Sequence, residues 1–251
     1  MTGSDTQHQT GAGTQLVERI IVALDYPDAS GAEKLLQQLK GIPCYMKVGM
    51  ELFYAAGPQF VLRLKEEGYK VFLDVKMHDI PNTVKGGSAS VTRLGVDMFN
   101  VHAAGGLAMM QAAREGVEAA LAGSPGARRP ILIGVTQLTS TSRAVLNDEI
   151  GLAGSVEDAV LRYAGLAREA GLDGVVASPL EVPGIKARCG PSFVTVTPGI
   201  RPAGAELGDQ SRVMTPREAF AQGTDYIVIG RPVTAAPDPR EALEQIVASL
   251  Y

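Results

Sequence analysis

The sequence has few cysteines, little net charge and no long hydrophobic run. Its 251 residues include only two cysteines, Cys44 and Cys189, far apart in the chain. So few thiols, without paired spacing, predict neither a disulfide framework nor a cysteine-based zinc site. No apolar run has the length needed to cross a bilayer, and residues 1–15 lack a charged and then apolar signal pattern. We therefore expect a cytoplasmic protein with a flexible N-terminal tail at residues 1–15.

The small negative net charge limits the classes of molecule that the protein could bind. The formal net charge is -4 at pH 7. An acidic balance of this size gives no general attraction to nucleic acid or to an anionic membrane. We expect neither as a partner, and an anionic ligand would have to be bound by a few local residues.

The hydrophobic content is sufficient for one large core. Hydrophobic residues make up 45% of the sequence and charged residues 20%, an ordinary balance for a globular protein. Short apolar runs alternate with longer segments of helical pattern, and no Gly/Ser linker interrupts the series. Eight runs are predicted to be strands: Ile20–Leu24, Cys44–Val48, Lys70–Asp74, Met98–Val101, Ile131–Val135, Gly174–Ala177, Phe193–Thr197 and Tyr226–Ile229.

Eight strand and helix repeats allow either an open doubly wound sheet or a closed barrel. The repeats between Asp25 and Gly230 average about 29 residues each, which suits a strand, a helix and two loops. The number of repeats and the total length favour a single (β/α)8 TIM barrel over residues 16–251. The ligand site of such a barrel lies at the carboxyl ends of its strands.

One charged stretch follows the third predicted strand. Asp74 and Lys76 are two residues apart, so strand alternation predicts that they project to the same side. Asp79 follows three residues later, where a loop is expected, and adds a second carboxylate near the mouth. Because isolated charges resist burial, this cluster is either a structural ion pair or a group kept for chemistry.

Polar residues also occur at the carboxyl ends of the other predicted strands. Each of these residues alone could be an ordinary polar residue with a structural role. Because they lie at the same end of consecutive strands, they are more readily explained as parts of one ligand site. The residues are Asp25, Lys47, His102, Thr136 with Gln137, Ser178, Pro198 with Arg201, and Gly230 with Arg231.

The last two strands are predicted to bind phosphate. TIM barrels often bind phosphate with the loops after strands seven and eight. Here those loops contain Arg201 and the pair Gly230–Arg231. Glycine lets backbone N–H groups approach an anion, and a guanidinium can bind it through two parallel hydrogen bonds. The alternative is that both arginines are solvated loop residues.

The charges favour decarboxylation. Lys47 and Lys76 with Asp74 and Asp79 form a set without net charge. A positioned ammonium can protonate a developing carbanion, and a fixed carboxylate beside it would crowd an anionic substrate. Together they suit loss of CO2 followed by protonation of the carbon. Asp74 with Asp25 offers two oxygen ligands for a divalent metal, but Lys47 places a positive charge where a further carboxylate would be needed.

These residues resemble a known family. The chain from about residue 18 to its C-terminus is similar to orotidine 5'-phosphate decarboxylases. The resemblance is carried by Asp74-x-Lys76-x-x-Asp79-Ile80-Pro81-Asn82-Thr83, by Asp25, by Lys47 in Tyr45-Met46-Lys47-Val48-Gly49, by Thr136 in Gly134-Val135-Thr136, by Pro198-Gly199-Ile200-Arg201-Pro202 and by Ile229-Gly230-Arg231.

The resemblance implies a homodimeric barrel that uses no cofactor and converts orotidine 5'-monophosphate to uridine 5'-monophosphate and CO2, the last step of de novo pyrimidine synthesis. It implies the following roles: Lys76 as proton donor to C6, Asp74 facing the substrate carboxylate, Lys47 and Asp25 at the ribose hydroxyls, Asp79 and Thr83 in the partner subunit's site, Thr136 and Ser140 near the pyrimidine, Gln210 in a closing loop at residues 202–212, and Arg201, Gly230 and Arg231 at the phosphate. Ile80 and Pro198 are expected as further substrate-binding residues.

Two other functions remain open from the sequence. One is a metal-dependent sugar-phosphate decarboxylase or aldolase on a related barrel, which can share the Asp74, Lys76 and Asp79 spacing. That enzyme would need a metal-ligating carboxylate where this chain has Lys47. The other is a barrel that binds a phosphorylated ligand without catalysis, which offers no reason for lysines interleaved with aspartates.

Overall fold

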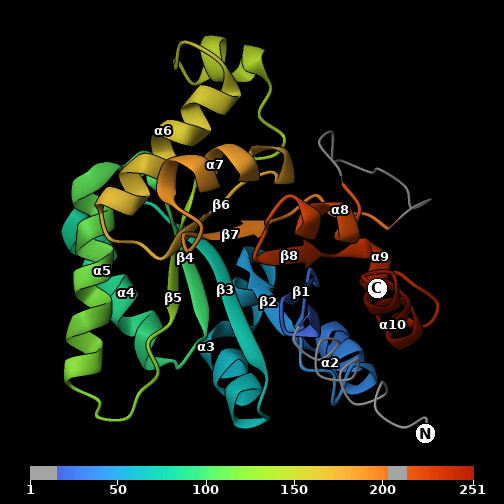
Figure 1. Ribbon diagram of the computed structural model, residues 1–251. Coiled ribbons are helices and arrows are strands. Elements are labelled where there is room, and N and C mark those ends of the chain that lie inside the picture. The colour runs from blue at the N-terminus through green and yellow to red at the C-terminus, as the bar shows by residue number, and fades with distance from the viewer. Residues whose placement is uncertain (1–15, 203–213) are drawn as a thin grey trace, which may run out of the picture.

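Eight parallel strands form a closed barrel in the computed structural model, which describes residues 16–202 and 214–251. Each strand pairs with its neighbours in chain order, and β1 pairs with β8 to close the barrel, with Ile21 opposite Val228 (Figure 1). The predicted (β/α)8 architecture is therefore confirmed. The strands are β1 Ile20–Ala23, β2 Tyr45–Gly49, β3 Lys70–Met77, β4 Met98–His102, β5 Ile131–Val135, β6 Gly174–Val176, β7 Val194–Thr197 and β8 Tyr226–Ile229.

Helices surround the strands. They are α2 Ala29–Gln38, α3 Met50–Glu66, α4 Pro81–Arg93, α5 Gly106–Ala122, α6 Val156–Glu169, α7 Val182–Cys189, α8 Pro216–Ala221, α9 Arg231–Thr234 and α10 Pro239–Ala248. No helix in the described part of the chain is long and apolar enough to cross a membrane.

Local capping residues set the ends of the helices. The Ser155 hydroxyl accepts the backbone N–H of Asp158 at 3.0 Å and so begins α6. The helix stops just before Gly171, whose φ of 78° is readily adopted by glycine. Thr215 and Asp238 cap α8 and α10 in the same way, each followed by a proline. These ends lie where the sequence places them.

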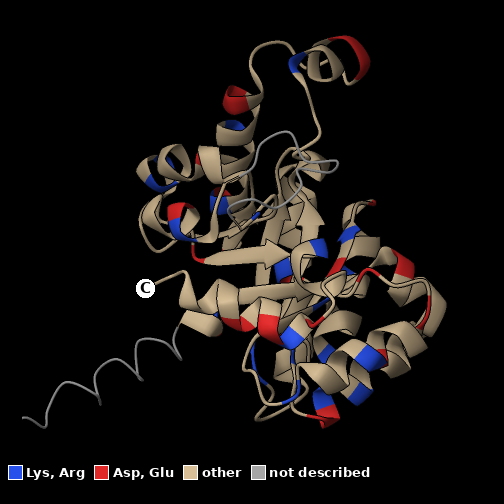
Figure 2. Ribbon diagram, turned by 90° about the vertical axis from the view of Figure 1, so that its right-hand side faces the viewer, with Lys and Arg blue, Asp and Glu red and all other residues tan. Residues whose placement is uncertain are grey.

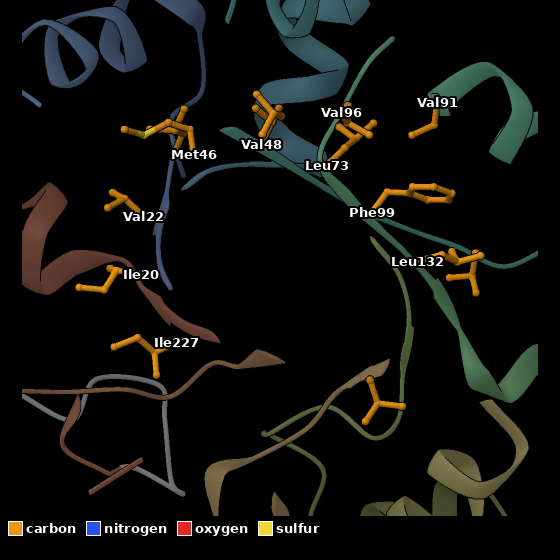
Figure 3. Close-up of a cluster of buried hydrophobic side chains, with 14 of the residues drawn as sticks. Ile20, Val22, Met46, Val48, Leu73, Val91, Val96, Phe99, Leu132 and Ile227 are labelled. Carbon is orange, nitrogen blue, oxygen red and sulfur yellow. The ribbon is translucent and has the colours of Figure 1, made fainter. Parts of the chain in front are cut away.

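Alternation along the strands divides the core into two parts. Ile20 and Val22 point outward and pack between the sheet and the helices, together with the side chains drawn in Figure 3. A separate cluster fills the barrel interior and consists of Ile21, Tyr45, Phe72, Met98, Ile133 and Val196. Both faces of the sheet are therefore buried, as the continuous apolar runs of the sequence predict.

The amino ends of the strands are tied together by repeated aspartates. Three aspartates precede the even-numbered strands β4, β6 and β8. Each accepts a backbone N–H of the preceding strand and pairs with a basic side chain: Asp97 with Val71 and Lys65, Asp173 with Leu132 and Arg129, and Asp225 with Thr195 and Lys186. These aspartates therefore have a structural role at the amino ends of the strands. The ligand site is expected at the carboxyl ends.

Candidate active site

A cavity of about 670 Å³ opens at the carboxyl ends of the strands. Charged residues lie mainly on the helices and loops, and the strands are largely uncharged (Figure 2). The cavity is an exception to this pattern. Its lining includes these predicted site residues: Asp25, Lys47, Asp74, Lys76, Ser140, Pro198, Arg201, Gly230 and Arg231.

Strand alternation brings polar side chains into the barrel at one level. Tyr45 on β2 and Phe72 on β3 face the interior. The next inward positions, two residues later, hold Lys47 and Asp74. Each is only 8% exposed. The sequence therefore places opposite charges on neighbouring strands, just above an apolar floor.

Lys47 is held between two carboxylates. Its Nζ lies 3.2 Å from Asp25 Oδ1 and 3.4 Å from Asp74 Oδ2. Burial acts to lower the pKa of Lys47, but the carboxylates of Asp74 and Asp25 outweigh it and raise the pKa above its usual value. Lys47 is therefore a fixed cation at neutral pH.

Asp74 lies between two ammonium groups. Its Oδ1 lies 2.8 Å from Lys76 Nζ, while its Oδ2 faces Lys47. Burial acts to raise the pKa of Asp74, but the two lysines lower it below the usual value. The result is a continuous series of alternating charges, from Asp25 through Lys47 and Asp74 to Lys76. Within the single chain, Asp25 therefore joins Lys47, Asp74 and Lys76 in the series, and the part expected of Asp79 from the partner subunit stays a prediction.

The backbone at Lys76 differs from the predicted regular strand. We expected the strand to end at Asp74, but β3 continues to Met77. Its pairing with β4 shifts register between Leu73 and Met77, and Lys76 has a φ of 49°. Asp74 and Lys76 do meet, but across an irregularity, so simple alternation was the wrong reason for their contact.

Asn100 on β4 belongs to the same cluster and was missed by the sequence analysis. It is fully buried, and its Nδ2 donates to Asp74 Oδ1 at 2.7 Å. Its Oδ1 accepts the backbone N–H of Lys76 at 2.8 Å. The signal was available, because Asn100 lies two residues after the inward-facing Met98 and is polar within an apolar strand.

His102 follows Asn100 at the next inward position. Its ring lies 5.6 Å from the ring of His78, measured between centroids. Burial, together with His78 and Lys76, lowers the pKa of His102 below its usual value. His102 is therefore neutral at pH 7 and adds no charge to the cluster.

The opposite side of the cavity contains the predicted phosphate residues. Arg201 and Pro198 follow β7, and Gly230 with Arg231 follows β8, where α9 begins. Arg201 Nη1 donates to the carbonyl of Ile200 at 2.9 Å, which holds the side chain beside its own loop. Two guanidinium groups and a glycine therefore meet where the sequence predicted an anion site.

Other predicted residues lie elsewhere. Thr136 is 3% exposed, and its hydroxyl donates to the carbonyl of Val176 at 2.8 Å. It is absent from the described residues that line the cavity, and its neighbour Gln137 lines it instead. The Thr136 hydroxyl thus donates to β6 and can still accept a hydrogen bond, so its expected place near the pyrimidine stays a prediction. Gln210 and most of the predicted closing loop lie outside the described residues.

The segment that begins α4 also lies outside the cavity lining. Asp79 and Thr83 are exposed, and Ile80 is 67% exposed. Asp79 Oδ1 accepts the backbone N–H of Ile80 at 2.6 Å. These three residues therefore lie on the surface of the chain, although they are at most seven residues from Lys76 in sequence.

The donor set is unsuited to a divalent metal. Within residues 16–202 and 214–251 there is no group of three or more histidine, cysteine or acidic side chains that could hold an ion. The two cavity carboxylates, Asp25 and Asp74, have the Lys47 ammonium between them. A bound metal would have to compete with that cation.

Known proteins resemble this chain over most of its length. A family model described as "Orotidine 5'-phosphate decarboxylase / HUMPS family" matches residues 18–246. The orotidine 5'-phosphate decarboxylase of Moorella thermoacetica is 56% identical over 235 residues, which are 93% of this chain and 92% of that protein. The enzyme of the same name from Bacillus cytotoxicus is 53% identical over 227 residues, which are 90% and 94% of the two chains.

Solved structures agree with these sequence matches. The orotidine 5'-phosphate decarboxylase of Lactobacillus acidophilus superposes with a TM-score of 0.83 at 42% identity and covers 93% of this chain and 99% of that one. An uncharacterized conserved protein from Geobacillus kaustophilus superposes with a TM-score of 0.82 at 46% identity, covering 92% and 100%. With the geometry of the cavity, these matches show that the chain belongs to the orotidine 5'-phosphate decarboxylase / HUMPS family.

Proposed function

We propose that this chain converts orotidine 5'-monophosphate to uridine 5'-monophosphate and CO2, without a metal or cofactor, as the last step of de novo pyrimidine synthesis. The observation that carries the proposal is the series of alternating charges Asp25, Lys47, Asp74 and Lys76 in the cavity. Family membership and the names of the relatives support it. Because its two cysteines are free and buried, we also expect the enzyme to act in the reducing cytoplasm.

The chemistry requires one bond to break and one to form. The bond between C6 and the carboxylate breaks, its electron pair stays on C6, and CO2 leaves. Lys76 then donates a proton from its ammonium to C6 and regains one from solvent. The Asp74 carboxylate at 2.8 Å holds the Lys76 ammonium in place. It would also lie against the substrate carboxylate, and loss of CO2 would relieve that repulsion.

The remaining cavity residues bind the rest of the nucleotide. Lys47 and Asp25 contact the ribose hydroxyls. They form the end of the charge series away from Lys76, and the Asp25 side chain is exposed where it lines the cavity. Arg201, Gly230 and Arg231 bind the phosphate, together with Pro198 at the same side. Ser140 lies near the pyrimidine, on a loop whose residues from Gln137 to Ser140 all line the cavity. These distant contacts hold the ring where it can react.

An absorbance assay tests the activity. Purified chain should consume orotidine 5'-monophosphate at the same rate with and without excess EDTA, since the proposal uses no metal. Orotidine without its phosphate should react far more slowly, because the phosphate contacts are then lost. A sugar-phosphate enzyme of the metal-dependent kind would lose its activity with EDTA, and a binding protein would show no turnover at all.

We further propose that the enzyme is a homodimer whose active sites are shared. Asp79, Ile80 and Thr83 are exposed in the single chain and lie beside its catalytic strand. Ile80 is a large apolar side chain that is 67% exposed, which suits a protein interface. In a two-fold dimer each subunit would present this segment to the cavity of the other.

Mixing two inactive variants tests the shared site. Lys76→Ala and Asp79→Ala should each be inactive alone. When they are co-expressed, a mixed dimer has one cavity with both Lys76 and the partner's Asp79 intact. Since half of the dimers are mixed and each has one intact site, activity should recover to about a quarter of the wild-type value. If Asp79 acts within its own subunit, no cavity is complete and activity stays absent.

A further inference from the structure

The pairing of β3 with β4 is interrupted beside the reactive lysine. Leu73 pairs with Phe99, and the next pair is Met77 with Val101. Three residues of β3, from Asp74 to Lys76, therefore stand opposite the single residue Asn100. Extra residues in one strand leave backbone groups without their regular partners. Such a group needs another acceptor when it is buried.

Asn100 supplies that acceptor with its side chain. Its Oδ1 accepts the Lys76 backbone N–H at 2.8 Å, while its Nδ2 donates to Asp74 Oδ1 at 2.7 Å. The direction of the amide follows from its partners, because a backbone N–H requires the oxygen and a carboxylate requires the NH2 group. One buried side chain thus joins the backbone of one charged residue to the carboxylate of the other.

Both contacts control where the Lys76 ammonium lies. A left-handed φ of 49° is uncommon for lysine, so the conformation depends on the contacts that hold it. The hydrogen bond to Asp74 Oδ1 also fixes the rotation of the carboxylate, so that Oδ1 meets Lys76 and Oδ2 meets Lys47. Without Asn100 the carboxylate could turn, and the Lys76 backbone would lose its acceptor.

We propose that Asn100 is a positioning residue for the decarboxylation, which aligns Asp74 and Lys76 with the reacting carbon without touching the substrate itself. This inference rests on the decarboxylase activity proposed above. It gives β4 a part in the reaction: Asn100 positions two charged residues of β3, which those residues cannot do themselves.

Asn100→Ala should lower kcat by about 100-fold, the effect of a displacement of about 1 Å at a reacting group. KM for orotidine 5'-monophosphate should change by less than about threefold, because the phosphate residues lie on β7 and β8 loops that Asn100 does not contact. The control is Thr195→Val. Thr195 is also fully buried, and its hydroxyl bonds Asp225 at the opposite end of the barrel. The Thr195→Val variant should be less stable than wild type and keep the wild-type kcat.

Asn100→Asp provides a second test that keeps the shape of the side chain. A protonated aspartate could still donate to Asp74 and accept from Lys76, whereas an ionised one would repel Asp74. Lys47 and Lys76 favour the ionised form of Asp74, so a shared proton resides on the new carboxyl. The ratio of wild-type to variant kcat should therefore rise with pH.

The outcomes separate the two proposals. If wild-type protein does not turn over the nucleotide, the proposed function fails. If wild type is active and Asn100→Ala keeps its kcat within about threefold, the role of Asn100 is refuted. It is also refuted if Thr195→Val loses as much kcat as Asn100→Ala, or if the Asn100→Asp deficit is the same at every pH. Should Asn100→Ala fail to fold, the aspartate variant and its pH profile decide the question.

Discussion

Lys76→Ala is expected to lower kcat for orotidine 5'-monophosphate by about 10,000-fold, the upper range for loss of a general acid. The Lys76 ammonium lies in the cavity, 2.8 Å from Asp74 Oδ1. No other ammonium of β3 faces the cavity among the described residues, and Lys47 is engaged by both Asp25 and Asp74. Without Lys76, the electron pair left on C6 has no positioned proton donor.

Binding should survive this substitution. The phosphate side of the cavity is formed by Arg201, Gly230 and Arg231, which lie on other strands. The product uridine 5'-monophosphate should therefore bind Lys76→Ala with a Kd within about tenfold of the wild-type value, measured by calorimetry. A fall in kcat with retained binding assigns Lys76 to the chemical step.

The same strand offers a matched control. Lys70 begins β3 at the opposite end of the barrel, where its Nζ pairs with Glu18 Oε2 at 2.8 Å. Lys70→Ala removes an ion-paired lysine of comparable exposure and should leave kcat unchanged. Near-normal turnover in Lys76→Ala would remove Lys76 from the reaction, and an equal loss in Lys70→Ala would show that the effect is general.

Much of the architecture could be predicted because it depends on local patterns. The strand ranges follow from short apolar runs, and the start of α6 follows from Ser155. Alternation within β2 places Lys47 inside the barrel once Tyr45 faces inward. These features require only the preferences of neighbouring residues, so the sequence alone predicts them well.

The finer geometry of the site could not be predicted because it depends on pairing between strands. The left-handed backbone of Lys76 arises where β3 shifts register against β4. No local pattern in the charged stretch indicates that shift. The same holds for Asp25, which follows β1 and pairs with Lys47 on β2: only the pairing of these strands in the barrel brings the two residues together.

The second large effect concerns the stability of the charge series. Asp74→Asn keeps the size of the side chain but leaves Lys47 and Lys76 without their shared partner. The Asp74 side chain is 12% exposed and that of Lys47 is 11% exposed. Breaking a buried ion pair by removing one partner costs about 3–5 kcal/mol in the free energy of unfolding. We expect a loss in this range at pH 7, measured by urea denaturation, together with a fall in kcat of at least about 100-fold.

The loss should depend on pH in a defined direction. The pKa of Asp74 is lowered in the folded chain by Lys47 and Lys76, which overcome the opposing effect of burial. Its contribution to stability is therefore present above the unfolded pKa of about 3.9 and disappears as pH falls through the lower folded value. The difference between wild type and Asp74→Asn should thus be constant from pH 5 to 8 and should shrink as the pH is lowered from 5 toward 3.

Asp25→Asn is the control for this stability experiment. Asp25 pairs with the same Lys47 ammonium, at 3.2 Å, but its side chain is 63% exposed. An exposed ion pair contributes at most about 1 kcal/mol, because water and salt screen it. Asp25→Asn should therefore destabilise the chain far less than Asp74→Asn, and its effect should weaken in high salt. Equal losses from the two substitutions would mean that burial of Asp74 between the lysines is not what makes its charge structurally important.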